Sequence, residues 1–220
     1  MIRLSSSEKR NQIISDLSKK FSSSYKSFQI DKFKKVIHDQ QRFFLDRMDI
    51  KQGIGKNLPL SENIFVIITC ILNQIPLIIT GNPGSSKTLA MNLILKSFKG
   101  KLSSNSFFKN YPTFLSYYYQ GSEQSTSKGI EKVYKKAHEE QEKKDRNVTQ
   151  IVVVFDEIGL AEKSPNNPLK VMHSLLEPPR VATVGLSNWS LDASKMNRVI
   201  TLSRTSPGEE DLKKSAESIA

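Results

Sequence analysis

The sequence has a single cysteine, Cys70, and only three histidines. One cysteine forms neither an internal disulfide nor a cysteine-based zinc centre. The histidines His38, His138 and His173 are too scattered along the chain to indicate a metal centre. A chain without a disulfide framework fits a reducing compartment, and we expect a cytoplasmic location.

Long uninterrupted hydrophobic runs are also missing. The N-terminus mixes serine with charge and lacks the apolar core of a signal peptide. The most apolar region, residues 64–80, is interrupted by Asn73, Gln74 and Pro76. It is better divided into a buried helix over about residues 61–73 and a buried strand over residues 77–80. We therefore expect no transmembrane segment.

Charge is plentiful but unevenly placed. The formal net charge is +11, and residues 1–60 hold 13 basic and 6 acidic side chains. A basic arm of this kind can contact nucleic acid or an anionic membrane surface. No aromatic-interleaved basic cluster and no nucleic-acid motif accompanies it, so a solvated helical face is favoured and nucleic acid is not an expected partner.

A phosphate-binding loop is the clearest motif in the chain. Residues 81–88 read Gly-Asn-Pro-Gly-Ser-Ser-Lys-Thr between an apolar run and a helix-forming segment. A loop that enters a helix directs backbone N–H groups at phosphates, its lysine reaches the β- and γ-phosphates, and its threonine ligates Mg²⁺. The loop departs from the common pattern because Ser86 stands where glycine is usual, and we expect Gly84 to supply the backbone freedom. The candidate nucleotide contacts are Gly81, Asn82, Pro83, Gly84, Ser85, Ser86, Lys87, Thr88 and Leu89.

A second motif is an apolar strand that ends in two carboxylates. Residues 151–155 are continuously apolar and Asp156 and Glu157 follow them. In a phosphate-loop protein these positions suit an aspartate that orients Mg²⁺ and a glutamate that activates water. The alternative, a turn rich in glycine and proline followed by an unrelated strand end, is weakened because both motifs occur in the expected order.

Strands and helices alternate along the rest of the chain. Strands are expected at Tyr111–Gln120, Arg180–Leu186 and Val199–Leu202, a loop at 102–110, and a helix beginning at Asn167-Pro168. This alternation predicts an α/β fold with a parallel sheet between helices, in which ligands bind beyond the carboxyl ends of the strands. The phosphate loop, the two carboxylates and Asn188 all follow strands, so they should converge.

Several segments resemble one particular family. The order of the motifs resembles the AAA+ ATPases, and the match extends to the mysterin family, giant RING-finger E3 ubiquitin ligases with a dynein-like AAA+ core. The segments that carry it are PLIITGNPGSSKTLA (76–90), GSEQSTSKGI (121–130), FDEIGLAEKSPNNPLKVMHSLL (155–176) and GLSNWSLDASKMNR (185–198). The family also has Gly-Ser-Ser-Lys in its loop.

The resemblance implies one AAA+ large subdomain with a five-stranded parallel sheet, here without its helical lid. It implies that ATP and Mg²⁺ are bound, that Asn188 senses the γ-phosphate, and that Arg198 acts as an arginine finger toward a neighbouring AAA+ module. A structural salt bridge is the equal alternative for Arg198. The expected division is a helical basic arm (1–55), the ATPase subdomain (56–205) and a C-terminal tail (206–220). No Cys/His zinc module is present, so any ligase centre lies outside this chain.

Two functions follow from these features. The first is an AAA+ module that hydrolyses ATP when assembled with neighbours, with Glu157, Asn188 and Arg198 as catalytic residues and Thr88 and Asp156 as metal-binding residues. The second is a non-hydrolysing regulatory or assembly module whose conformation is set by bound nucleotide. Nucleic-acid-dependent translocation has only the charge in its favour.

Overall fold

One parallel sheet forms the centre of the molecule. The computed structural model describes residues 12, 15, 16, 19, 20, 30–192, 194, 197–204 and 208–217. Five strands lie in the order β2-β3-β4-β1-β5, and every neighbouring pair is parallel. The strands are β1 (Leu77–Thr80), β2 (Thr113–Gln120), β3 (Thr149–Asp156), β4 (Ala182–Ser187) and β5 (Ile200–Ser203). The expected α/β fold with a five-stranded parallel sheet is confirmed.

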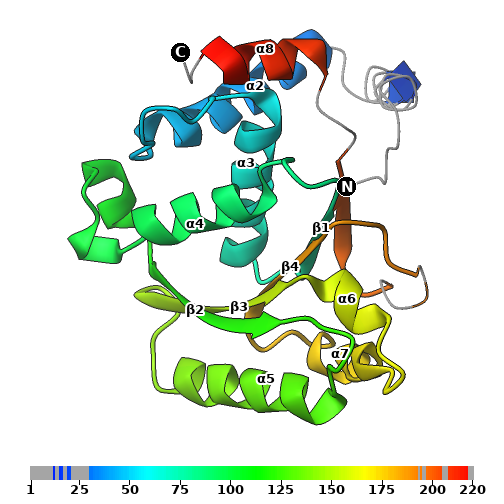
Figure 1. The fold of residues 1–220 in the computed structure, drawn as a ribbon. Coiled ribbons are helices and arrows are strands. Elements are labelled where there is room, and N and C mark those ends of the chain that lie inside the picture. Colours follow the sequence, from blue (N-terminus) through cyan, green and yellow to red (C-terminus); the bar gives the residue numbers. More distant parts are fainter. Residues whose placement is uncertain are drawn as a thin grey trace.

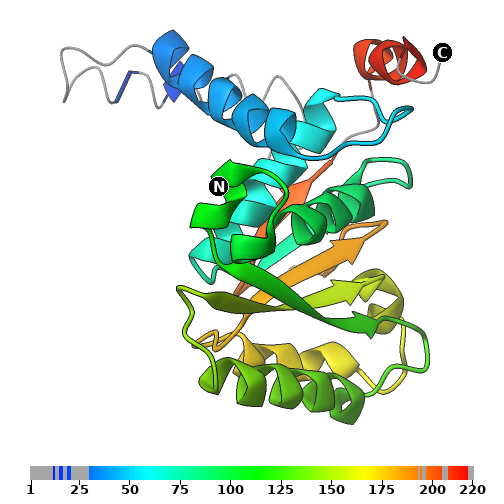
Figure 2. The same cartoon turned by 90° about the vertical axis from the view of Figure 1, so that its left-hand side faces the viewer.

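Helices cover both faces of this sheet (Figure 1). One face carries α3 (Leu58–Leu72) and α4 (Lys87–Ser97), with α2 (Ile30–Arg47) packed against α3. The opposite face carries α5 (Ser127–Glu142), α6 (Ile158–Glu162) and α7 (Met172–Leu175). Figure 2 shows the same layers with β2 nearest the viewer, at one edge of the sheet. The sheet thus has a separate hydrophobic core on each side.

The central strand β3 shows why the apolar runs become strands. It lies between β2 and β4, and residues 151–155 are fully buried. A parallel strand with helices on both faces has no solvated side, so its sequence is continuously apolar rather than alternating. Asp156, at the carboxyl end of the strand, is partly exposed, whereas the residues directly before it are buried.

Helix α3 begins earlier than expected. The side chain of Asn57 accepts a hydrogen bond of 3.0 Å from the backbone N–H of Leu60, and Pro59 lies in the first turn. An N-cap side chain followed by proline satisfies the free amides of a helix start. The helix therefore starts at Leu58, three residues before the predicted position.

One local prediction is wrong and another is only partly right. Residues 102–110, expected as a loop, contain parts of two 3-10 helices, η1 (Gly100–Leu102) and η2 (Ser106–Asn110). The helix expected to begin at Asn167-Pro168 does begin at Pro168, with Asn167 in the N-cap position, but the φ of Asn167 is 42° and its side chain makes no capping hydrogen bond. A left-handed residue cannot direct its side chain at the N2 and N3 amides as an extended N-cap does. The segment after it forms a short 3-10 helix, η3 (Pro168–Val171), before α7.

The expected basic arm is described only in part. Phe44 of helix α2 and Met48, which directly follows the helix, are buried in the core. The predicted helical residues before Ile30 lie outside the described residues, apart from five positions. The tail contains a helix, α8 (Glu209–Glu217), whose Ser215 Oγ accepts a hydrogen bond of 3.2 Å from Asn57 Nδ2.

Candidate functional site

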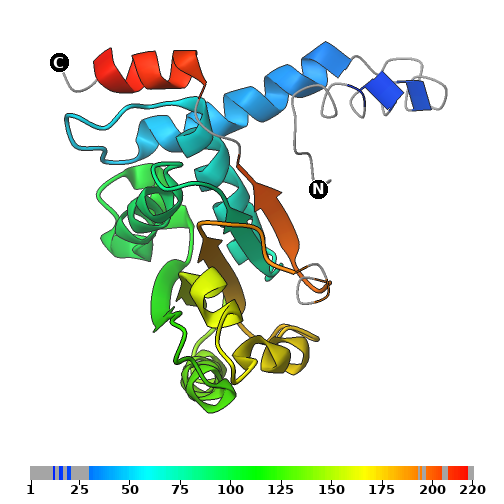
Figure 3. The ribbon, with the colours of Figure 1, turned by 45° about the vertical axis from the view of Figure 1, so that its right-hand side comes forward.

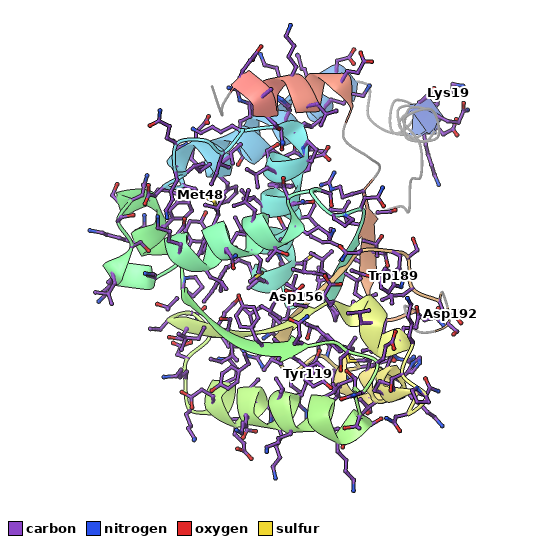
Figure 4. All side chains as sticks on the ribbon, in the orientation of Figure 1. Lys19, Met48, Tyr119, Asp156, Trp189 and Asp192 are labelled. Atoms are coloured by element: carbon purple, nitrogen blue, oxygen red, sulfur yellow. The ribbon has the colours of Figure 1, made fainter. Side chains whose placement is uncertain are left out.

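A cavity of about 430 Å³ lies at the carboxyl ends of β1, β3 and β4. Figure 4 shows Asp156 at this edge of the sheet, with Trp189 and Asp192 in the turn that follows β4. The expected convergence of the two motifs with Asn188 therefore occurs. The cavity is lined by Pro83, Gly84, Ser85, Ser86, Lys87, Thr88, Leu89, Asp156, Glu157, Leu186, Ser187 and Asn188.

The loop between β1 and α4 has two residues in the left-handed region. Gly84 has φ 84°, and Ser86 has φ 59°. The expectation that Gly84 replaces the usual glycine at position 86 is therefore only half right, because Ser86 itself takes the left-handed conformation. A non-glycine residue there costs about 1–2 kcal/mol. Ser85 Oγ donates a hydrogen bond of 2.8 Å to Asn82 O, which closes the loop on itself.

Lys87 is the best-anchored side chain of the loop. Its Nζ donates to Gly81 O at 2.6 Å, to Asn82 O at 3.1 Å and to Ser85 Oγ at 3.1 Å. A fourth bond, of 3.2 Å, goes to Asn188 Oδ1 at the end of β4. The lysine is 7% exposed, and burial lowers its pKa below the ordinary value. The carboxylates of Glu157 and Asp156 partly offset this lowering of the pKa, so a cation is held within reach of two anions.

Asn188 joins the lysine to the glutamate. Its Nδ2 donates to both carboxylate oxygens of Glu157, at 2.8 Å and 3.0 Å. Its Oδ1 accepts from Lys87, so the acceptor end of the amide contacts the first motif and the donor end contacts the second. The three side chains form one connected row across the cavity.

Glu157 is held in an unusual backbone conformation. Its φ is 50°, and its N–H donates a bond of 3.0 Å to Asp156 Oδ1. Left-handed non-glycine residues are uncommon and gather at functional sites, where the surrounding structure fixes them. Here the neighbour that fixes it is Gly121, whose N–H donates to Asp156 O at 2.8 Å and which lies against the Glu157 carbonyl.

Thr88 and Asp156 supply oxygen atoms to the same cavity. Thr88 is exposed at the first turn of α4, and Asp156 is partly exposed at the end of β3. Hydroxyl and carboxylate oxygens are the ligands that Mg²⁺ prefers, and Mg²⁺ commonly keeps several waters beside one or two protein ligands. The donor set fits Mg²⁺. Within the described ranges no group of three or more His, Cys, Asp or Glu side chains forms an all-protein metal centre.

Arg198 lies outside the cavity. Its Nε pairs with the carboxylate of Glu177, and its NH1 contacts the ring Nδ1 of His173. His173 lies in α7 and Glu177 lies two residues after it, on the other side of the sheet from α4. The structure thus shows the salt bridge that the sequence offered as an alternative, and it does not place Arg198 at this chain's own loop.

Sequence reasoning missed the residues that support the loop from behind. Asn63 donates to the carbonyl of Ser85 at 2.9 Å, and Arg204 Nε donates to Asn63 Oδ1 at 2.7 Å. Arg204 also pairs with Glu62. The only signal in the sequence was the polar run 61–63 near the start of a mainly apolar helix.

The described part of the chain contains no helix with the length and hydrophobicity needed to cross a bilayer.

Comparisons with known proteins place these features in a family. The family described as "RNF213 AAA domain" matches residues 53–211. The human E3 ubiquitin-protein ligase RNF213 is 40% identical over 189 residues, which are 81% of this chain and 4% of that protein. The zebrafish (Danio rerio) E3 ubiquitin-protein ligase rnf213-beta is 36% identical over 223 residues, 96% of this chain and 4% of that protein. The chain therefore spans about 4% of the length of these relatives.

A solved structure agrees at the level of the fold. The Aeropyrum pernix ORC2 protein, described in ADPNP and ADP complexes, superposes with a TM-score of 0.50 at 13% identity. The match covers 75% of this chain and 54% of that one.

Proposed function

Because the chain belongs to the RNF213 AAA domain family, we propose that it binds ATP with Mg²⁺ and hydrolyses ATP when a neighbouring AAA+ module completes the site. RNF213 is mysterin, so the family resemblance drawn from the sequence is confirmed. The observation that carries the proposal is the row Lys87, Asn188 and Glu157 across a cavity that the phosphate loop lines.

The loop residues bind the phosphates in this proposal. Residues 83–89 line the cavity where the chain enters α4, so the first-turn N–H groups and the positive end of the helix dipole are available to phosphate. The N–H of Gly81 donates instead to Ser187 O. Lys87 supplies the counter-charge for the β- and γ-phosphates, because a charge-assisted bond to phosphate is stronger than its present bonds to neutral carbonyls. Thr88 and Asp156 hold Mg²⁺, and the ion, when bound, neutralises charge on the phosphates.

Glu157 and Asn188 act on the water in this proposal. Glu157 accepts a proton from the attacking water as general base. Asn188 already spans the distance between Lys87 and Glu157, so it can orient the γ-phosphate on one side and the base on the other. Arg198 is proposed to act on the site of the next module, after leaving Glu177.

The wider setting belongs to the same proposal. The arm (1–55), the ATPase subdomain (56–205) and the tail (206–220) are parts of one AAA+ module in a longer E3 ligase of the RNF213 type, located in the cytoplasm. Neighbouring AAA+ modules are its partners, and the ligase centre lies elsewhere in the longer protein.

A second function has one observation in its favour. Both carboxylate oxygens of Glu157 are engaged by Asn188. If this contact persists when nucleotide is bound, the base is not free, and the module binds nucleotide as a regulatory or assembly element without hydrolysing it.

The test of nucleotide binding is the removal of the Lys87 charge. Titration calorimetry with ATP and Mg²⁺ should show that Lys87→Ala lowers the affinity at least about tenfold, or about 1.4 kcal/mol. Lys96→Ala is the matched control, since Lys96 lies at the far end of the same helix and pairs with Asp49 on the surface. Equal affinities of wild type and Lys87→Ala would contradict the phosphate-loop assignment.

A further inference from the structure

One polar side chain is completely buried in the apolar helix α3. Asn63 is 0% exposed and lies next to Ile64 in the core beneath the sheet. A buried amide without hydrogen-bond partners destabilises the fold by about 1–3 kcal/mol, so the partners of Asn63 explain how its side chain is accommodated in the core. Its Nδ2 donates to Ser85 O at 2.9 Å, and its Oδ1 accepts from Arg204 Nε at 2.7 Å. Asn63 therefore bridges the phosphate loop and the residue that follows β5.

Arg204 is itself a buried charge at the edge of the sheet. Its side chain is 6% exposed and pairs with Glu62, whose side chain is 18% exposed. A buried pair of this kind gives little net stability, because the desolvation of both charges offsets their attraction. The position of the pair beside the loop therefore calls for a reason other than stability.

The backbone around Arg204 also touches the loop. Its N–H donates to Thr80 O at 2.7 Å, directly before the loop. A Cβ built on Gly81 would lie 2.6 Å from Arg204 Cβ, so the first residue of the loop packs directly against Arg204. The arginine thus holds the loop at two places, at Gly81 by packing and at Ser85 through Asn63.

We propose that Arg204 is a positioning residue for the phosphate loop, acting through Asn63, and that it couples nucleotide affinity to the segment that follows β5. Figure 3 shows β5 at the edge of the sheet, alongside α3. The chain then leads to α8, and Ser215 of α8 contacts Asn57 at the start of α3. The segment after β5 is therefore tied to α3 at both ends, and a shift of that segment moves the carbonyl at the back of the loop.

The effect on nucleotide rests on the proposed function, whereas the effect on the loop does not. The experiment therefore measures both in the 220-residue chain. The variant is Glu62→Gln with Arg204→Met, which removes both charges and leaves no unpaired buried carboxylate. The matched control is Asp49→Asn with Lys96→Met, which removes a surface ion pair that does not touch the loop. Arg204→Lys is a second variant that keeps the charge opposite Glu62 but loses the forked geometry of the guanidinium.

Hydrogen exchange without nucleotide is the first measurement. The amides of Ser85 and Ala90, which donate to Asn82 O and Ser86 O, should exchange at least about tenfold faster in the Glu62/Arg204 variant than in the control, because the loop loses its support. Calorimetry with ATP and Mg²⁺ is the second, and the affinity should fall about five- to tenfold in this variant and in Arg204→Lys, at temperatures where both are folded.

The outcomes separate the two proposals. Loop exchange and nucleotide affinity equal to those of the control would overturn the positioning role of Arg204. A wild-type chain that binds no nucleotide would overturn the proposed function, while faster loop exchange in the Glu62/Arg204 variant would still support the positioning role.

Discussion

At the scale of single residues, the site has two unusual features, the left-handed backbone of Glu157 and the Asn188 amide that hydrogen-bonds to both Lys87 and Glu157. Glu157 is left-handed, and its carboxylate is held by the same Asn188 side chain that accepts from Lys87. This arrangement ties the proposed base to the lysine proposed to bind phosphate, so a ligand that draws Lys87 away from Asn188 also changes the contact that restrains Glu157. The sequence predicted that these residues converge, because all of them follow strands, but it did not predict the hydrogen bonds that join them into one row.

The role of Glu157 is testable by a change that preserves its shape. Glu157→Gln keeps the size of the side chain but removes the base, so ATP should still bind while turnover falls about 10²-fold or more. The comparison requires an assembled protein with measurable wild-type turnover, and the exposed Glu123→Gln is its control. Unchanged turnover in Glu157→Gln would favour the non-hydrolysing module or another base.

Cys70 gives a prediction for pH. It is buried in α3, and burial raises its pKa from 9.0 to about 11. Because the folded pKa lies above the unfolded one, the contribution is fully present below about pH 9 and is lost as the pH rises toward 11. The melting temperature of wild type should therefore fall more steeply between pH 8 and pH 10.5 than that of Cys70→Ala. The lysines and tyrosines are the same in both proteins, so the difference between the two curves reports the thiol. Parallel melting curves for the two proteins would show that the thiol does not titrate in this way.

Some residues of the site were beyond the reach of the sequence. Ser86 was recognised as a departure from the usual loop, yet its left-handed φ of 59° was not predicted, because a serine residue does not favour that conformation. Asn63 and Arg204 are separated by a long stretch of chain, and their bond depends on the packing of α3 beside β5. Long-range polar contacts of this kind have no local signature, whereas the phosphate loop is a contiguous motif.

At the scale of elements, buried strands were predicted better than short helices. Continuous apolar runs predicted β1, β3 and β4 within two residues, because a strand buried on both faces has no polar position. The η3 and α7 region was predicted as one helix beginning at an Asn-Pro cap. The change from 3-10 helix to α-helix after Val171 divides it, and helices of four residues carry too little periodicity to predict.

The close approach of Gly121, which follows β2, to Glu157, which follows β3, gives a prediction at this scale. A Cβ on Gly121 would lie 2.2 Å from the carbonyl oxygen of Glu157, and that contact is with backbone, which cannot rotate away. Gly121→Ala should therefore lower the free energy of unfolding by about 1–3 kcal/mol, as overpacking does, and displace Glu157. Gly129→Ala in α5 is the control, because its Cβ would meet only side chains, the nearest atom being the Tyr119 hydroxyl at 3.2 Å. Denaturant unfolding of both variants is the measurement, and equal stabilities would contradict the close approach.

At the scale of the whole molecule, the phosphate loop and Arg198, which both belong to the proposed mechanism, lie on different sides of the sheet. The phosphate loop opens at the carboxyl edge next to α4, whereas Arg198 lies by α7 with Glu177 and His173. One chain therefore presents a nucleotide cavity at one place and a restrained arginine at another. This is the arrangement expected if Arg198 serves the site of a neighbour, and it is also that of a simple structural salt bridge.

The last prediction separates these two roles of Arg198. In a longer protein with adjoining modules, Arg198→Ala should depress ATP hydrolysis about 10³-fold or more while this module's own nucleotide affinity stays nearly unchanged, because an arginine supplied in trans stabilises charge at the neighbour's γ-phosphate. Glu177→Ala is the matched variant, since it breaks the same ion pair but leaves the guanidinium free to act. If the pair is only structural, both variants should lose the same small amount of stability, about 0–1 kcal/mol for an exposed pair, and hydrolyse ATP alike. The isolated 220-residue chain should bind nucleotide and hydrolyse it very slowly, so brisk turnover by a demonstrably monomeric chain would refute the shared site.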